Sequence, residues 1–140
     1  MMQPSPSVAD ATRQSLAALQ NNDADGIRAA FADSNALVAI GTDPAEYFRG
    51  HAETTGVFAD QAEALVGMTI EPGDIEAYEQ GGVGWSSSRP TFRLPDGAEV
   101  PVRLTAVFTR EGDGWRAIQW HASVGVDNAE TTGFEDLPMG

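Results

Sequence analysis

The sequence contains no cysteine and no lysine, and these two absences exclude several classes of chemistry. Without cysteine there can be no disulfide, no thiolate nucleophile and no cysteine-ligated zinc site. Without lysine, Schiff-base catalysis and a Walker-type phosphate loop are excluded. The two histidines, His51 and His121, do not have the spacing of a metal site. We therefore expect no metal and no other cofactor.

Positive charge is scarce as well. The chain has eight arginines and 21 acidic residues, which gives a formal net charge of −13. Such a chain repels phosphate backbones and anionic lipid, so we expect neither a nucleic acid nor a membrane as its partner. No apolar run approaches the roughly 20 residues of a membrane span. The opening "MMQPSPSVAD" has no basic stretch and no apolar segment typical of a signal peptide. These features predict a cytoplasmic location.

The first half of the chain has helical patterning. Ser7 can cap a first helix and Asp23 a second, and "NALVAIGT" is typical of a buried strand. In "TDPAE", Asp43 is expected to be the N-cap of a helix, with Glu46 three residues later as in a capping box. A further helix is expected over residues 51–66.

The second half changes to a period of two residues. Turn sequences such as "EPGD", "EQGG", "LPDG" and "REGDG" separate runs rich in β-formers, as in an antiparallel meander. Helices followed by a meander predict an α+β fold with helices on one face of a curved sheet. We expect one domain over residues 1–128 and an acidic, aperiodic tail over residues 129–140. The predicted strands are 68–71, 74–79, 83–94, 99–110 and 115–125.

Three stretches carry a resemblance to a known family: "ALVAIGTDPAEYFRG", "GVGWSSSRPTFRLPDGAEVPVRLTAVFTREGDGW" and "RAIQWHASVGV". Over about residues 8–128 the chain resembles the SnoaL-like branch of the nuclear transport factor 2-like superfamily, to which ketosteroid isomerase and scytalone dehydratase also belong. The resemblance implies a cone-shaped α+β barrel, with N-terminal helices packed on a strongly curved, mostly antiparallel sheet. It also implies a conical pocket between helices and sheet, and a homodimer formed through the outer face of the sheet.

The last predicted strand has no clean polar face. By comparison with the kinase association domain of the same fold, Ile118, Trp120 and Ala122 would face the helices. The residues between them, including His121, would then face the dimer partner. A β-bulge would reverse this assignment.

Three residues are candidates for catalysis, and each has a plainer explanation. His121 could act as a general base, or it could be a hydrogen-bonding histidine on the sheet. Asp43 could be compared with the catalytic aspartate of ketosteroid isomerase, but a helix cap is the simpler explanation, because it needs no chemistry. Tyr47 could donate a hydrogen bond to a ligand carbonyl, or it could be an aromatic wedge between helix and sheet.

The arginines are unevenly distributed. Residues 83–94, 100–110 and 115–125 carry five arginines and no acidic residue, so they hold a charge of +5 and leave −18 for the rest of the chain. The low β-propensity of Asp and Glu explains part of this pattern, and carboxylates elsewhere could pair with the arginines. Alternatively, Arg103 could hold an anionic or carbonyl-bearing ligand in the pocket.

Three functions remain open from the sequence. The first is a homodimer that binds a small, largely apolar molecule in the conical pocket. The second is a cofactor-independent isomerase, cyclase or dehydratase acting on a cyclic ketone or polyketide-like substrate, with Asp43 or His121 as the base. The third is an assembly module whose pocket is filled by side chains. The residues expected to line the pocket are Tyr47, Trp85, Ser87, Arg103, Leu104, Ala106 and Trp120.

Overall fold

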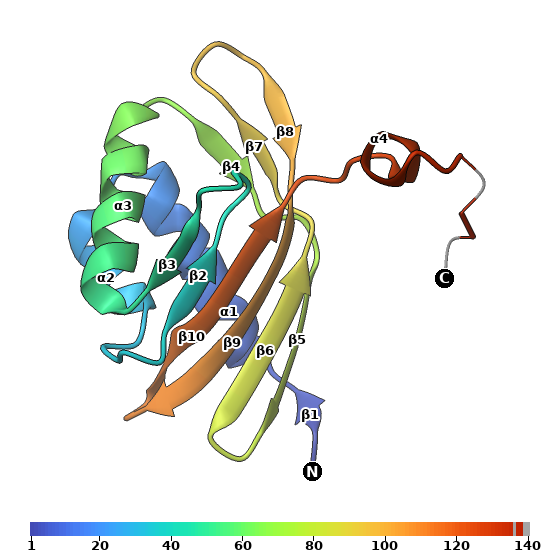
Figure 1. The fold of residues 1–140 in the computed structure, drawn as a ribbon. Helices are drawn as coiled ribbons and strands as arrows, with labels where there is room; N and C mark the ends of the chain where they lie inside the picture. The colour runs from blue at the N-terminus through green and yellow to red at the C-terminus, as the bar shows by residue number, and fades with distance from the viewer. Residues whose placement is uncertain (136, 139–140) are drawn as a thin grey trace.

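The computed structural model describes residues 1–135, 137 and 138, and it has the expected α+β architecture. Three helices cover one face of a seven-stranded sheet (Figure 1), whose strand order is β1-β5-β6-β9-β10-β2-β3. All neighbouring strands of this sheet are antiparallel except β10 and β2. The sheet is open at β1 and β3, so it is a curved half-cone rather than a closed barrel. The strands of the main sheet are β1 Gln3–Pro4, β2 Val38–Ile40, β3 Tyr47–Arg49, β5 Ile75–Gln80, β6 Val83–Ser88, β9 Arg103–Glu111 and β10 Gly114–Ser123.

The helices are α1 Pro6–Gln20, α2 Ala24–Ala30 and α3 His51–Ala64. The predicted cap of α2 is confirmed, because the Asp23 carboxylate accepts a hydrogen bond from the Gly26 backbone N–H at 3.0 Å. The predicted cap of α1 is wrong by two residues. Ser5, not Ser7, accepts from the backbone N–H of Val8. None of the helices in the described part of the chain is both long and apolar enough to cross a membrane.

The predicted helix start at Asp43 is also wrong. Residues 43–46 form a turn between β2 and β3, and α3 begins later, after Gly50. The turn nevertheless has capping hydrogen bonds: the Asp43 carboxylate accepts from the Ala45 N–H at 2.8 Å, and the Glu46 carboxylate accepts from the Asp43 N–H at 2.9 Å. The same side chains can satisfy the N–H groups of a turn or of a first helical turn, so the local sequence does not distinguish the two.

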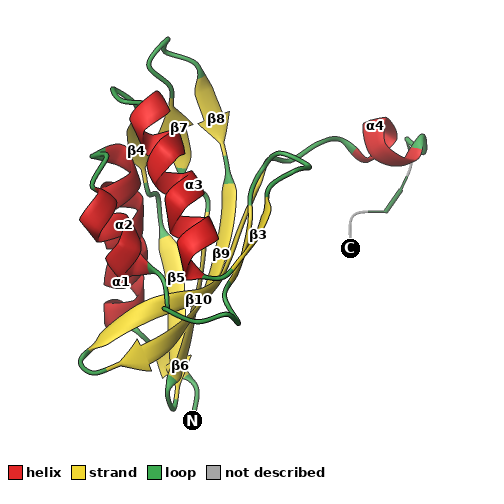
Figure 2. Cartoon of the chain, turned by 60° about the vertical axis from the view of Figure 1, so that its left-hand side comes forward, coloured by secondary structure: helices red, strands yellow, loops and turns green. Residues whose placement is uncertain are grey.

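The two longest predicted strands are each broken in two. The expected strand 83–94 becomes β6 and β7 Thr91–Arg93, and the expected strand 99–110 becomes β8 Glu99–Pro101 and β9. Pro90 lies at the break, where it has no N–H to donate to a ladder, and its carbonyl accepts from the Val102 N–H at 2.9 Å. Beyond this break, β7 and β8 pair with β4 Thr69–Glu71 in a separate three-stranded sheet (Figure 2).

A β-bulge at Ile118 determines which residues of β10 face the helices. Trp115 and Ala117 are buried before the bulge, and Trp120 is buried after it, while His121 is exposed. The expected inward orientation of Trp120 is therefore confirmed, and the bulge shifts the alternation upstream of it. Trp120 packs against Phe31 and Phe58, with ring centroids 5.5 and 6.4 Å apart, at the centre of the core.

The acidic tail is not wholly irregular, since it contains the short helix α4 Asn128–Thr132. This segment leaves the end of β10 and extends away from the body of the domain (Figure 1). Its described side chains are exposed, and the exposed apolar residues from residue 124 onward include Val126 and Phe134. Residues 136, 139 and 140 of the predicted tail lie outside the described residues.

Candidate functional site

The inner cavity lies between the helices and the two sheets and has a volume of about 410 Å³. Most of its wall comes from α1, α3, the segment between α3 and β4, the β2–β3 turn, and strands β9 and β10. The bent end of the β7–β8 hairpin supplies the rest. The break at Pro90 creates this cavity, because it turns the end of the hairpin out of the main sheet. The lining residues are Leu16, Leu19, Gly41, Thr42, Glu46, Phe58, Gln61, Ala62, Leu65, Met68, Pro90, Phe92, Leu94, Val100, Val102, Leu104, Trp120 and Ala122.

The polar lining of the inner cavity comes from its rim. Thr42 and Glu46 belong to the turn between β2 and β3, and Gln61 comes from α3. The Glu46 side chain is half-buried, and its carboxylate accepts hydrogen bonds from the Asp43 N–H and from the Gln61 side-chain amide. Gly41 makes room for it, because a Cβ atom at that position would lie 2.6 Å from Glu46 Oε1. The carboxylate is therefore held in one position at the rim.

Among the described residues that line the inner cavity, Glu46 has the one ionisable side chain. Proton abstraction next to a carbonyl needs a positioned base together with donors that stabilise the developing oxyanion. The cavity provides a single carboxylate that already accepts two hydrogen bonds. The inner cavity is therefore apolar except at its rim, where the polar side chains lie.

A second hollow, of about 690 Å³, lies on the outer face of the main sheet. Its lining residues are polar except for Leu104, and they come from β5, β6, β9, β10 and the residues directly before β5 and after β6. The lining residues are Asp74, Glu76, Ser87, Ser88, Arg89, Arg103, Leu104, Thr105, His121 and Ser123. Among the residues that the structure describes, no group of three or more histidine and acidic side chains could hold a metal ion.

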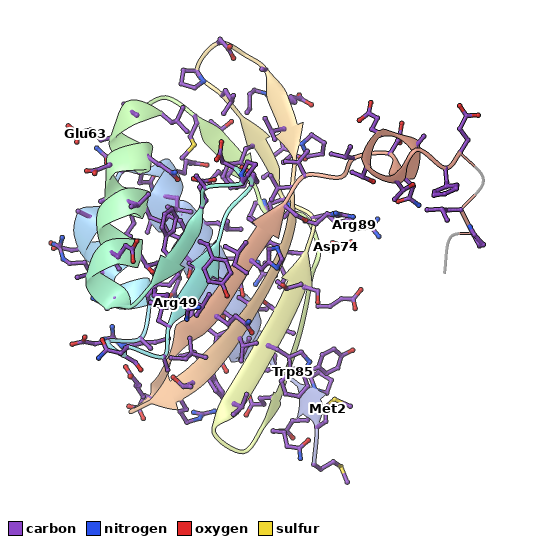
Figure 3. All side chains as sticks on the ribbon, in the orientation of Figure 1. Met2, Arg49, Glu63, Asp74, Trp85 and Arg89 are labelled. Atoms are coloured by element: carbon purple, nitrogen blue, oxygen red, sulfur yellow. The ribbon has the colours of Figure 1, made fainter. Side chains whose placement is uncertain are left out.

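The charged groups of this outer hollow are not paired with one another. Within residues 1–135, 137 and 138, none of Asp74, Glu76, Arg89 and Arg103 forms an ion pair. Arg103 donates a hydrogen bond to the Ser123 hydroxyl at 3.2 Å. Figure 3 shows Asp74 and Arg89 at the same end of β5 and β6. The outer hollow thus presents two acids and two arginines to its surroundings.

The other three strand arginines have carboxylate partners. Arg110 pairs with Glu79 at 3.3 Å, and Arg116 pairs with Glu111 at 2.6 Å. Arg93 pairs with Glu99, whose hydrogen bond and charge raise the pKa of the Arg93 guanidinium. Pairing with neighbouring carboxylates therefore explains the presence of these three arginines on the strands.

The predicted pocket residues divide between the two faces of the sheet. Leu104 and Trp120 line the inner cavity, and Ala106 lies in the buried core opposite Trp120. Ser87 and Arg103 line the outer hollow. Ser87 is exposed next to the buried Ser86 of β6, and Arg103 is exposed next to the buried Leu104 of β9.

Trp85 also lies on the outer face, away from the inner cavity. It stacks on Tyr78, its cross-strand partner in β5, with ring centroids 6.3 Å apart. The alternation of β6 accounts for this position, since its neighbours Gly84 and Ser86 are buried against the helices.

The three predicted catalytic residues are outside the inner cavity. His121 and Tyr47 lie in one row across the outer face, separated by Ile40 of β2, and Tyr47 is 53% exposed. Asp43 is exposed in the β2–β3 turn, where its carboxylate accepts the Ala45 N–H. The structure therefore brings His121 together with Ser87 and Arg103 in the outer hollow, and leaves Asp43 apart from them.

Sequence reasoning missed most of the inner-cavity wall. Phe92, Leu94 and Val100 were expected to belong to uninterrupted strands or their turn, and Glu46 to a helix start. Pro90 was the available signal, since proline is disfavoured inside a paired strand. Interpreting it as a break would have placed the hairpin end in a separate sheet.

With this geometry known, comparison with other proteins is informative. A model of the SnoaL-like domain family matches residues 8–127. The chain belongs to this family. No curated protein sequence matches the chain.

Solved structures similar to this SnoaL-like domain share its fold at low sequence identity. A nuclear transport factor 2-like protein of unknown function from Pseudomonas putida has a TM-score of 0.77 and 21% identity, with 94% of both chains covered. A proposed dehydratase from Streptomyces avermitilis has a TM-score of 0.76 and 17% identity, covering 86% of this chain and 94% of the other. A proposed ketosteroid isomerase from Shewanella frigidimarina has a TM-score of 0.69 and 20% identity, covering 84% and 94%. These likenesses establish the fold of the SnoaL-like domain, and function has to be argued from its own residues.

Proposed function

We propose that this SnoaL-like domain is a homodimer whose inner cavity binds a small, largely apolar molecule. The observation that carries the proposal is the composition of the cavity wall, where aliphatic and aromatic side chains surround a single rim carboxylate. A volume of about 410 Å³ falls within the range of about 300–1,000 Å³ that is typical of small-molecule sites. Transfer of an apolar ligand from water to this apolar cavity would lower the free energy.

Binding can be tested with N-phenyl-1-naphthylamine, a neutral probe whose fluorescence rises in apolar surroundings. We expect saturable binding to the wild-type protein. Ala122 lines the inner cavity on β10, so Ala122→Phe should fill part of it and weaken binding by about tenfold or more. The neighbouring His121 faces the other side of the sheet, so His121→Ala should bind the probe as the wild type does.

Two results would contradict this part of the proposal. One is the absence of saturable binding to the wild-type protein. The other is unchanged binding in an Ala122→Phe variant whose circular dichroism is native. The first of these results would favour an assembly module, in which the cavity has no ligand.

The homodimer is supported by the composition of the outer sheet face. Cross-strand pairing aligns one row of residues across it, from Tyr78 and Trp85 through Val107 and Gln119 to Val38. Four of these five side chains are half-buried and one is exposed. Aromatic and aliphatic side chains in one row are typical of the centre of a protein interface.

The outer hollow also has the charge distribution that a symmetric dimer needs. In a two-fold interface the same patch meets itself, so a patch carrying both signs can pair each arginine with an acid of the other copy. Asp74 and Glu76 with Arg89 and Arg103 make such a set.

The dimer can be tested by light scattering during size-exclusion chromatography. We expect the wild-type protein to elute as a dimer at micromolar concentration. Val107→Glu, at the centre of the row, should give a monomer, because it would place two carboxylates in the interface. Val126→Glu, on the exposed tail, is the matched control and should remain dimeric. A monomeric wild type, or a dimeric Val107→Glu variant, would rule out this interface.

A cofactor-independent isomerase, cyclase or dehydratase is the second candidate, and the cavity wall offers it less support. His121, Asp43 and Tyr47 lie outside the inner cavity, which leaves Glu46 as the one carboxylate at its rim. Turnover of a cyclic ketone that is lost in Glu46→Gln but retained in His121→Ala would establish catalysis in this cavity.

A further inference from the structure

The rim of the inner cavity sets the charge of the molecule that can occupy it. In the part of the chain that the structure describes, Glu46 is the one ionisable lining residue, and no arginine or histidine lines the cavity with it. The next acidic residue in the same turn, Asp43, is exposed and adds charge of the same sign nearby. A ligand with an anionic group at this rim would meet a carboxylate with no cation to offset it.

The Glu46 carboxylate retains capacity to accept hydrogen bonds from a ligand. An ionised carboxylate offers about four lone-pair sites on its two oxygens. One bond to Oε1 comes from the Asp43 N–H at 2.9 Å, and one bond to Oε2 comes from the Gln61 side-chain amide. Both groups donate to the carboxylate, and the half-buried position of Glu46 limits screening by water.

The position of this carboxylate is fixed by its surroundings. The absence of a side chain at Gly41 lets Glu46 Oε1 lie against the strand, and the Gly41 N–H closes the turn by donating to the Glu46 carbonyl at 2.9 Å. Gln61 anchors the other oxygen from α3. A charge that is already held in place loses little freedom when a ligand binds to it.

From these observations we infer that the inner cavity selects molecules with an apolar body and a protonated amine, which donates hydrogen bonds to Glu46. This inference rests on the proposed binding function and specifies its ligand class. It replaces the expectation that Arg103 would select an anionic or carbonyl-bearing ligand, because Arg103 lies on the opposite face of the sheet. We expect the affinity of the cavity to be highest for amines, lower for neutral alcohols and lowest for carboxylates.

Three probes with the same ring system test this order: 2-naphthylmethylamine, 2-naphthalenemethanol and 2-naphthoate. Affinities are measured by isothermal titration calorimetry at near-physiological salt and pH 7.5, where screening weakens the general attraction of a negatively charged protein for cations. For the wild type we expect the amine to bind about tenfold more tightly than the alcohol, a difference of about 1.4 kcal/mol. The carboxylate should bind more weakly than the alcohol.

Two matched variants separate the rim charge from the net charge. Glu46→Gln removes the carboxylate at the rim and should bring the amine and the alcohol to similar affinities, with the alcohol unchanged. Glu63→Gln removes one charge from an exposed site on α3, near Gln61 in sequence but not lining the cavity (Figure 3), and should keep the tenfold preference. Retained binding of the alcohol shows that Glu46→Gln is folded.

The possible failures are distinguishable. Equal affinities of amine and alcohol in the wild type, or tighter binding of the carboxylate, would overturn the inference and leave the proposed binding function intact. An amine preference that persists in Glu46→Gln would also overturn it, since the preference would then arise from net charge. If none of the three probes binds to the wild type and N-phenyl-1-naphthylamine also fails, the binding function itself is wrong.

Discussion

At the scale of single residues, two buried threonines have opposite hydrogen-bonding states. Thr12 and Thr54 are both fully buried on helices that face the core. The Thr12 hydroxyl bonds to the Val8 carbonyl at 3.0 Å and to the Ser86 hydroxyl at 2.9 Å. The Thr54 hydroxyl has no partner among the residues that the structure describes. A buried hydroxyl without a partner costs free energy, whereas a paired one stabilises the fold.

Replacing each threonine by valine should therefore have opposite effects on stability. Thr12→Val leaves the buried Ser86 hydroxyl without this partner, so we expect the free energy of unfolding to fall by about 1–3 kcal/mol. Thr54→Val replaces an unpaired hydroxyl by a methyl group, and we expect an increase of about 1 kcal/mol. Urea denaturation of both variants provides the measurement. A loss of stability in Thr54→Val would mean that its hydroxyl has a partner.

Individual residues also show where sequence reasoning succeeded. Asp23 could be predicted because a local pattern, a cap before a helical stripe, determined its role. The inward orientation of Trp120 was implied by the resemblance to the kinase association domain of the same fold, because the pattern of the last strand left both faces possible. Asp43 and Trp85 could not be predicted. The Asp43 turn uses the same hydrogen bonds as a helix start, and the orientation of Trp85 depends on how β6 pairs with distant strands.

At the scale of elements, α1 packs unusually close to β6. A Cβ atom on Gly84 would lie 2.5 Å from Val8 Cγ2 and 3.5 Å from the ring of Trp115. Val8 is fully buried in the first turn of α1, so the contact cannot be relieved by turning a side chain into solvent. The glycine is thus what allows the helix to approach the sheet at this point.

We expect Gly84→Ala to lower the free energy of unfolding by about 1–3 kcal/mol, because the added methyl group overfills this contact. Gly82, in the turn before β6, is the matched control. Its Cβ would meet no atom of the described residues within 4 Å, so Gly82→Ala should have little effect. Equal effects of the two substitutions, measured by thermal or urea unfolding, would show that α1 can shift away from β6.

The hairpin from β6 to β9 illustrates what could be predicted about elements and what could not. Its existence, its approximate ends and its turn at "LPDG" were predicted from alternation and turn residues. Its break at Pro90, which divides it between two sheets, was missed because alternation continues on both sides of the break. Since residues on both sides of that break line the inner cavity, a correctly placed turn between uninterrupted strands still gave an incomplete set of lining residues.

At the scale of the whole molecule, net charge is the dominant electrostatic feature. The chain carries −13, and the ion pairs formed among its described residues are all exposed to some degree. Exposed ion pairs contribute roughly 0–1 kcal/mol each, and repulsion among the remaining carboxylates acts in the opposite direction. Repulsion should prevail because acidic residues outnumber arginines by more than two to one.

Sodium chloride should therefore stabilise the protein. Between about 10 mM and 0.5 M salt the screening length falls severalfold, and we expect the free energy of unfolding to rise by about 1 kcal/mol. A double variant of two exposed carboxylates on α3, Asp60→Asn with Glu63→Gln, should reduce this dependence. Urea unfolding at several salt concentrations measures it. Lower stability in high salt would mean that the ion pairs outweigh the repulsion.

The outermost strands have a bearing on solubility. Strand β1 has two residues, one of them Pro4, and β3 has three, so the main sheet ends in short segments at both sides. In the smaller sheet, the edge strand β8 ends in Pro101. Edge strands that are short or contain proline offer another chain few free backbone N–H and C=O groups. This disfavours polymerisation by edge-to-edge strand pairing. The proposed homodimer would instead use side chains on the broad outer face of the sheet, where a two-fold pair closes on itself and growth stops.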